Sequence, residues 1–204
     1  MQTIEETFSA TVEEKKSTFL AYLCPMSSFD TLHQKLKNDH PKAAHIVWAK
    51  RYFNEYRQIV ENNSDDGEPK GTSGPPVLNV MRGVELVEAG LLIVRYFGGI
   101  KLGTGGLVRA YGSSAKEVIA HAKLIPFVFK ERVLFSTIYS LVPRFEHYTS
   151  TQNVTVIKRE FQSDGVVWEI EVSADEKEHF LLFSHHFERD GFKLLTFLQK
   201  GKNV

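Results

Sequence analysis

The sequence contains, at residues 90–109, the run GLLIVRYFGGIKLGTGGLVR, which combines a strand, a glycine-rich turn and the start of a helix. Its first five residues form a continuous apolar stretch, which is typical of a strand buried on both faces. The turn follows directly, and Thr104 is predicted to cap the next helix. On that helix Leu107 and Tyr111 belong to the apolar face, while Arg109 falls on the other face. The run therefore predicts a central strand that ends in a polar surface.

A second glycine-rich run stands at residues 65–76 and reads DDGEPKGTSGPP. We call it the acidic segment, and we call residues 95–109 the glycine segment. Glycine tolerates left-handed backbone and lets another group approach the main chain closely. Because so much glycine weakens helices and strands, the two segments predict a surface site rather than a packed element. Pro75 and Pro76 fit the first turn of a helix, which leaves the acidic residues on a loop.

The pattern on either side of these segments predicts two domains. Before them we expect a β-hairpin, an amphipathic helix and two strands, at residues 7–23, 29–40, 45–49 and 58–61. After residue 130 the pattern restarts as strand, helix, two strands, helix and strand, at residues 133–140, 143–150, 154–161, 166–172, 175–190 and 192–198. Asp175 is predicted to cap the last helix. This βαββαβ order is the ferredoxin-like plan, so the prediction is an α+β chain with domains at 1–130 and 131–204.

Composition bounds the classes of function. The 204 residues include 25 Lys and Arg and 25 Asp and Glu, so the formal net charge is zero. This balance argues against a general polyanion binder but allows a local basic patch. Cys24 is the single cysteine, which excludes an internal disulfide and fits a reducing compartment. The first residues lack a basic start followed by an apolar run, and no stretch is long enough to cross a membrane, so we expect a cytoplasmic protein.

The glycine segment permits two interpretations. A strand, a glycine turn and a helix N-terminus together resemble an anion cradle, for which phosphate is the obvious guest. Gly98 and Gly103 have the spacing of a P-loop, but Thr104 stands where that motif requires lysine. Val108 stands where the dinucleotide fingerprint requires its third glycine. The remaining alternatives are a binding surface for phosphate or protein and a tight turn with exposed charges.

The acidic segment is equally open. Asp65, Asp66 and Glu68 have the oxygen ligands that Mg²⁺ prefers, and carboxylates also serve as acid/base groups. Clustered loop carboxylates more often give solubility or pair with basic side chains. Arg95 and Lys101 are the natural partners if the two segments meet in space.

Nucleophilic catalysis has little support in the sequence. Thr72 and Ser73 carry hydroxyl groups, but no spacing points to a base that would activate them. His45 is the one histidine that could serve as such a base, and its position fits a half-buried strand residue equally well. The sequence predicts no catalytic residue, no metal site and no cofactor.

The two segments together resemble a known family. The residues DDGEPKGTSG at 65–74 and VRYFGGIKLGTGGLVRAY at 94–111 closely resemble the signature of the IMPACT family, in the two-domain form of its YigZ-type bacterial members. Lesser agreements are Lys16 to Phe19 in the first hairpin and Ala44-His45 on the next strand. The resemblance covers most of residues 1–125. The remainder is similar in plan to the last domain of elongation factor G.

The resemblance implies a fold and a class of role. The first domain would be of the ribosomal-protein and GHMP-kinase type, with a four-stranded sheet backed by two helices and an unusual left-handed crossover. Eukaryotic members are linked to translational control. The resemblance transfers no catalytic residue to this sequence.

These observations favour a cytoplasmic regulatory protein that binds RNA, the ribosome or a protein partner in translational control. One alternative is an enzyme that acts on a phosphorylated or nucleotide-like molecule with Mg²⁺, and another is a pure protein-interaction module. In the RNA-binding case, Arg95, Lys101 and Arg109 would contact phosphates, and Tyr96 and Phe97 would stack on bases. The predicted binding residues are Asp65, Asp66, Glu68, Lys70, Arg95, Tyr96, Gly98, Gly99, Lys101, Gly103, Thr104, Gly105, Gly106 and Arg109.

Overall fold

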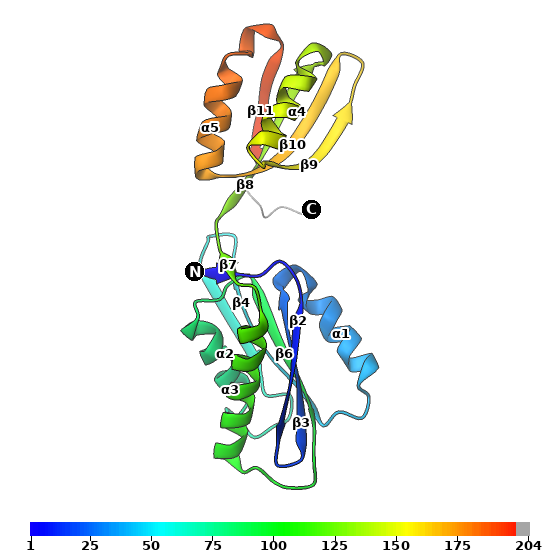
Figure 1. Cartoon of the computed structure of the whole chain (residues 1–204), viewed down its shortest axis with the longest axis vertical. Coiled ribbons are helices and arrows are strands. Elements are labelled where there is room, and N and C mark those ends of the chain that lie inside the picture. The colour runs from blue at the N-terminus through cyan, green and yellow to red at the C-terminus, as the bar shows by residue number, and fades with distance from the viewer. Residues whose placement is uncertain (199–204) are drawn as a thin grey trace. The chain divides into compact units, whose positions relative to one another are not determined.

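The computed structural model describes residues 1–198, which form two compact units that divide between Phe127 and Val128. Both units are mixed α/β structures (Figure 1). No helix in this part of the chain is long and apolar enough to cross a lipid bilayer.

The first unit is built on a five-stranded antiparallel sheet with the order β2-β3-β6-β4-β5. Its strands are β2 (Phe8–Glu14), β3 (Ser17–Pro25), β4 (His45–Phe53), β5 (Ile59–Ser64) and β6 (Ala89–Tyr96). Its helices are α1 (Phe29–Asp39), α2 (Gly74–Gly83) and α3 (Thr104–His121). The short strands β1 (Gln2–Thr3) and β7 (Ile125–Pro126) pair with each other.

Strand β6 lies in the middle of this sheet and is buried on both faces, as its apolar sequence predicts. Leu91 and Ile93 pack in the core under α2 and α3. Leu92 and Val94 point to the opposite face and pack with Phe29 of α1. The expectation of four strands and two helices is therefore wrong in number, because β5 adds an edge strand and α1 covers part of the second face.

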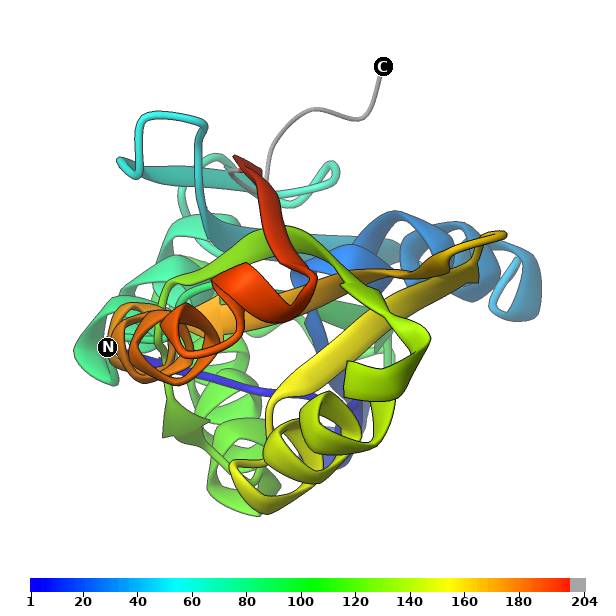
Figure 2. The same cartoon turned by 90° about the horizontal axis from the view of Figure 1, so that it is seen from above.

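The second unit runs β8 (Lys130–Ile138), α4 (Val142–Thr151), β9 (Thr155–Phe161), β10 (Gly165–Ser173), α5 (Ala174–His185) and β11 (Phe192–Leu198). Its antiparallel sheet has the order β11-β8-β10-β9. Both helices lie against the same face (Figure 2), where Phe145 of α4 and Phe180 of α5 pack on Phe135 and Trp168. The core of this unit is thus a cluster of aromatic rings, which bury a large apolar area.

Two predicted helix caps are wrong by one or two positions. Gly103 precedes α3 with a φ of 72°, so Thr104 is the first helical residue and not the cap. Ser173 caps α5, and it exchanges hydrogen bonds with Glu176 in a capping box. Asp175 instead lies in the first turn, where its charge still favours the helix dipole.

Candidate functional site

The acidic segment is organised around Asp65, whose carboxylate accepts four hydrogen bonds. Oδ1 accepts from the amide and hydroxyl of Ser73 (3.0 and 2.6 Å) and from the amide of Gly74 (2.8 Å). Oδ2 accepts from the amide of Gly71 (2.7 Å). Asp65 therefore caps the N-terminus of α2 from eight residues upstream, where the amides of a first helical turn otherwise have no partner.

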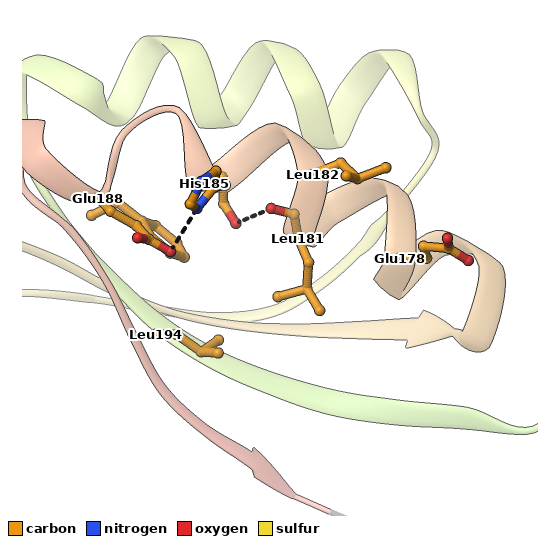
Figure 3. A pocket seen from close by; sticks show the side chains of 8 residues that line it. Glu178, Leu181, Leu182, His185, Glu188 and Leu194 are labelled. Atoms are coloured by element: carbon orange, nitrogen blue, oxygen red, sulfur yellow. Dashed lines mark hydrogen bonds and ion pairs between the residues drawn. The ribbon is translucent and has the colours of Figure 1, made fainter.

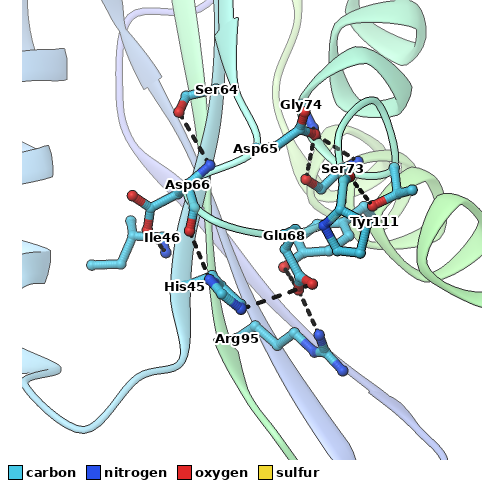
Figure 4. A network of polar contacts seen from close by, with 12 residues as sticks. His45, Ile46, Ser64, Asp65, Asp66, Glu68, Ser73, Gly74, Arg95 and Tyr111 are labelled. Atoms are coloured by element: carbon cyan, nitrogen blue, oxygen red, sulfur yellow. Dashed lines mark hydrogen bonds and ion pairs between the residues drawn. The ribbon is translucent and has the colours of Figure 1, made fainter. Parts of the chain in front are cut away.

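These contacts also set the charge state of Asp65. Burial raises the pKa of the carboxyl group, but the hydrogen bonds from Ser73, Gly71 and Gly74 lower it more, and the net pKa lies below its ordinary value. Hydrogen bonds from N–H and O–H donors favour the ionised form. The acidic segment thus holds an ionised Asp65 in its own loop (Figure 4).

Asp66 and His45 connect the acidic segment to strand β4. The Asp66 carboxylate accepts from the amide of Ile46 at 2.6 Å. The Nδ1 atom of His45 lies 2.6 Å from the Asp66 carbonyl oxygen. Because a carbonyl oxygen only accepts, Nδ1 is the protonated nitrogen, and Nε2 faces Glu68 Oε2 at 3.8 Å. His45 is thus fixed in orientation beside Glu68.

Glu68 is the centre of the contact between the two segments. Its Oε1 accepts from Arg95 Nη1 at 2.5 Å and from the Tyr111 hydroxyl at 2.7 Å. Glu68 and Arg95 are buried, with exposed fractions of 7% and 6%. Burial, and then the Glu68 carboxylate, raise the pKa of Tyr111, which keeps its hydroxyl protonated as a donor. The prediction that Arg95 would pair with the acidic segment is confirmed (Figure 4).

The rings around Arg95 complete this buried contact. Its guanidinium lies over Phe19 and Phe97, at 5.6 and 5.7 Å from the ring centroids. Phe19 also meets the ring of Tyr111 edge to face. A charged pair with little water needs such close polar and cation–π partners to offset its desolvation. Arg95 is therefore part of the packed interior and not a surface cation.

The glycine segment presents a different face. Lys101, Gly103, Thr104 and Gly105 are exposed, and so is Arg109. A hollow of about 260 Å³ lies between β2 and α3, and it is lined by Val12, Glu14, Lys15, Leu102, Gly106, Arg109, Ala110 and Ser113. Lys101 and Arg109 of this segment are thus open to a partner, whereas Arg95 is not.

Gly98 anchors this exposed segment to the first hairpin. A Cβ atom at Gly98 would lie 1.9 Å from the carbonyl oxygen of Lys16, so no side chain fits there. The Gly98 amide donates to the hydroxyl of Ser17 at 3.2 Å. Close approach of backbone to backbone explains this glycine.

The predicted binding set divides into four parts. Asp65, Asp66, Glu68 and Arg95 form the internal network, while Lys70 is exposed on the acidic segment. Tyr96 does not belong with Arg95, because successive strand residues point to opposite faces. Its hydroxyl lies 2.8 Å from His40 Nδ1, beside the C-terminus of α1. The rest of the set, including Gly98, Gly99 and Gly106, lies on the glycine segment.

Comparison with known proteins agrees with this signature. Residues 15–119, about half of the chain, match the model of the Impact N-terminal domain. An IMPACT family member of Haemophilus influenzae is 42% identical over 60% of this chain and 60% of its own length. The IMPACT family member YvyE of Bacillus subtilis is 32% identical over 86% of this chain and 80% of its own. The chain belongs to the IMPACT family.

One solved structure resembles nearly the whole chain. A crystal structure described as that of a hypothetical protein aligns over 96% of both chains, with a TM-score of 0.66 and 25% sequence identity. The chain spans only 60% of the length of the Haemophilus influenzae relative. The Impact N-terminal match includes both the acidic and the glycine segment.

Two residues that contact the candidate site were not predicted. Tyr111 was assigned to the apolar face of its helix, and its hydroxyl instead reaches Glu68, 43 positions away in sequence. Ser17 is fully buried and receives the Gly98 amide. A polar atom on an apolar helix face is the signal for Tyr111, but the sequence gives no partner for it.

The carboxylates of Asp65, Asp66 and Glu68 do not converge on a position where a metal ion could bind. Within residues 1–198, no group of three His, Cys, Asp or Glu side chains could hold a metal ion. The oxygen atoms of Asp65 and Glu68 face protein donors instead.

A further hollow of about 330 Å³ lies between α5 and β11 (Figure 3), and it is lined by Glu178, Leu181, Leu182, Ser184, His185, Glu188, Phe192 and Leu194, all in the second unit.

Proposed function

We propose that this IMPACT family chain is a regulatory binding protein of the translation machinery, and that its glycine segment contacts ribosomal RNA. The proposal rests on a difference in burial among the basic side chains of the glycine segment. The Glu68–Arg95 pair is buried, so Lys101 and Arg109 are the basic side chains of the glycine segment that reach solvent.

The charge at this surface suits phosphate. Lys15 lines the same hollow as Arg109, and the exposed Lys16 adjoins the backbone of Gly98. Together with Lys101 these residues bring four cations to the glycine segment and the neighbouring hairpin turn. Basic side chains that contact phosphates position RNA without reading its sequence, and their binding weakens as salt rises.

A protein partner is the second candidate. Phe97, Ile100 and Val108 are 51%, 44% and 41% exposed on the same glycine segment. Apolar side chains that stay in solvent beside cations are typical of protein-binding surfaces. Binding to a protein would depend on these three residues more than on Lys101 and Arg109.

The enzyme alternative has weaker support. It required the acidic segment to hold Mg²⁺, but Asp65 and Glu68 accept hydrogen bonds from their own loop and from Arg95 and Tyr111. Carboxylates that are already paired are poor ligands for a hard cation.

The proposal includes a fold class for each of the two units. The order β11-β8-β10-β9 supports a ferredoxin-like second unit. The assignment of the first unit to the ribosomal-protein and GHMP-kinase type, with a left-handed crossover, rests on the family resemblance. A translational role would place the protein in the cytoplasm. Fold class alone does not assign that role.

Co-sedimentation with ribosomes at low and moderate salt tests the proposal. The test variant is Lys101→Glu/Arg109→Glu, and Lys116→Glu/Lys123→Glu on α3 and the turn after it is the control with the same charge change. We expect the wild type and the control to sediment with ribosomes at low salt, and the test variant to remain in the supernatant. Binding that survives in the test variant but is lost in Phe97→Ser/Ile100→Ser supports the protein partner instead. No sedimentation of the wild type rules out the ribosomal proposal.

A further inference from the structure

A second surface of the first unit lies outside the signature. We infer that Trp48, Lys50 and Tyr52 on strand β4, which we call the β4 platform, bind the bases of single-stranded RNA. The inference deepens the proposed function, since it names the form of RNA and a second point of contact. None of the three residues belongs to the acidic or the glycine segment.

The fold places these side chains on one face. Alternate residues of a strand share a face, and Ile46 and Trp48 pack with Phe29 on the side of α1. Lys50 and Tyr52 continue this row, whereas Val47 and Ala49 point to the core under α2 and α3. The backbone of helix α1 approaches β6, and its Phe29 and His33 side chains reach Trp48, so α1 covers Trp48 in part. Trp48, Lys50 and Tyr52 are accordingly half-buried rather than buried.

Lys50 sits among three aromatic rings. Its Nζ atom lies 5.0 Å from the ring centroid of Phe29, 5.7 Å from that of Trp48 and 5.6 Å from that of Tyr52. These distances are within the range of cation–π attraction. Phe29 belongs to the core, but the other two rings reach solvent. A long lysine stem can leave such rings at small cost, so a base can take its place over Trp48 or Tyr52 while the ammonium moves to a phosphate.

Polar groups for base edges stand on the next strand. The register pairs Lys50 with Asn62 and Trp48 with Ser64, so these two side chains lie on the same face as the platform. Asn62 is exposed, and its amide nitrogen lies 3.5 Å from the Tyr52 hydroxyl. An amide beside a stacking ring can bond the edge of a base, which is how sheets read unpaired nucleotides.

Rings interleaved with lysines favour nucleic acid over an apolar peptide. Lys50 lies on the platform, and the exposed Lys37 lies on α1 near His33, which is itself tilted against Trp48. Asp30 and Asp66 also lie near His33, so the charge here is mixed and stacking on the rings carries the inference. Aromatic rings interleaved with cations are the arrangement that holds single strands, because every base has a stacking face and every linkage a phosphate. A duplex offers the phosphates but keeps its bases paired and stacked.

Tryptophan fluorescence gives a direct readout in the full chain. The chain has two tryptophans, and Trp168 is fully buried in the second unit, so a base that stacks on the surface quenches Trp48. The probes are a twelve-nucleotide oligouridylate, an oligoadenylate of the same length and a twelve-base-pair RNA duplex. We expect quenching by the single strands, no quenching by the duplex, and loss of the signal in Trp48→Phe with binding retained by fluorescence anisotropy.

Substitutions assign the contact to the platform. Tyr52→Ala should weaken binding of the oligonucleotide about tenfold, as removal of one stacking ring does elsewhere. Lys50→Gln should weaken it less and should reduce its dependence on salt. Phe161→Ala is the matched control, because Phe161 is an aromatic residue of the second unit that is 70% exposed. Tyr52→Leu retains apolar bulk in case Tyr52→Ala fails to fold.

The results separate this inference from the proposed function. If single strands do not quench Trp48, or if Phe161→Ala loses as much affinity as Tyr52→Ala, the β4 platform does not bind RNA bases and the inference is wrong. Equal quenching by the duplex also contradicts it. The ribosome experiment with Lys101→Glu/Arg109→Glu can succeed in each of these cases. Conversely, platform binding that persists in that double variant supports the inference even if the glycine segment has another partner.

Discussion

The acidic and glycine segments are both rich in glycine, but they carry opposite charge and turn it in opposite directions. The acidic segment turns two of its three carboxylates inward, where Asp65 caps α2 and Glu68 binds Arg95 and Tyr111. The glycine segment fixes its backbone at Gly98 and turns Lys101 and Arg109 outward. Glycine-rich signatures therefore need not be binding loops throughout. Here one half builds the support and the other half presents the surface.

Removal of Arg95 should destabilise the protein most. In Arg95→Met the Glu68 carboxylate remains buried with Tyr111 as its nearest donor. An unpaired buried charge should lower the free energy of unfolding by about 3–5 kcal/mol. Urea denaturation followed by circular dichroism measures the change. The double variant Arg95→Met/Glu68→Gln should recover part of the loss, and a double variant no better than the single one would contradict the pairing.

Asp65 should show the next largest effect, and the effect should depend on pH. Asp65→Asn removes the charge that accepts four hydrogen bonds and should lower the free energy of unfolding by about 1–3 kcal/mol at pH 7. Because the folded pKa is depressed, this stability is complete above the unfolded value of about 4 and is lost as pH falls through the folded pKa. Denaturation between pH 7 and 2 should bring wild type and variant together at low pH. A constant difference across that range would show that ionisation of Asp65 is not the cause.

Gly98→Ala tests the backbone contact that holds the glycine segment against the first hairpin. The added methyl group cannot fit beside the Lys16 carbonyl, so the glycine segment must move away from the hairpin. We expect a loss of about 1–3 kcal/mol, as in other overpacked sites. Gly105→Ala is the control, since its Cβ would meet only the flexible end of Arg109 at 3.6 Å. Thermal unfolding of both variants decides whether contact at Gly98 or glycine content is responsible.

The outward residues should matter least for stability. Lys101→Glu/Arg109→Glu should change the free energy of unfolding by no more than about 0.5 kcal/mol, because both side chains are exposed. The same urea titration used for Arg95→Met measures it. A large destabilisation would show that the glycine segment has a structural role and would remove the contrast between the two halves.

The sequence allowed the elements to be predicted better than their contacts. A continuous apolar run located β6, because a strand buried on both faces is apolar throughout. The last strand was also predicted at residues 192–198, as the structure has it. The caps of α3 and α5 were misplaced, since several polar residues near each start can serve and only geometry selects one. Tyr96 was grouped with Arg95 in one predicted binding set, although consecutive strand residues point to opposite faces. The contact of Glu68 with Tyr111 could not be foreseen, because no local rule joins residues so far apart.

The central position of β6 has a consequence for synthesis. The hairpins β2–β3 and β4–β5 are made first, but each pairs with β6 and not with the other. Until residues 89–96 have left the ribosome, the nascent chain holds two unconnected hairpins with unpaired edges, which are prone to pair wrongly. The sheet closes late and through contacts distant in sequence, which slows folding. The nascent chain is thus most prone to wrong strand pairing while about its first ninety residues emerge from the ribosome, before β6 is available to join the two hairpins.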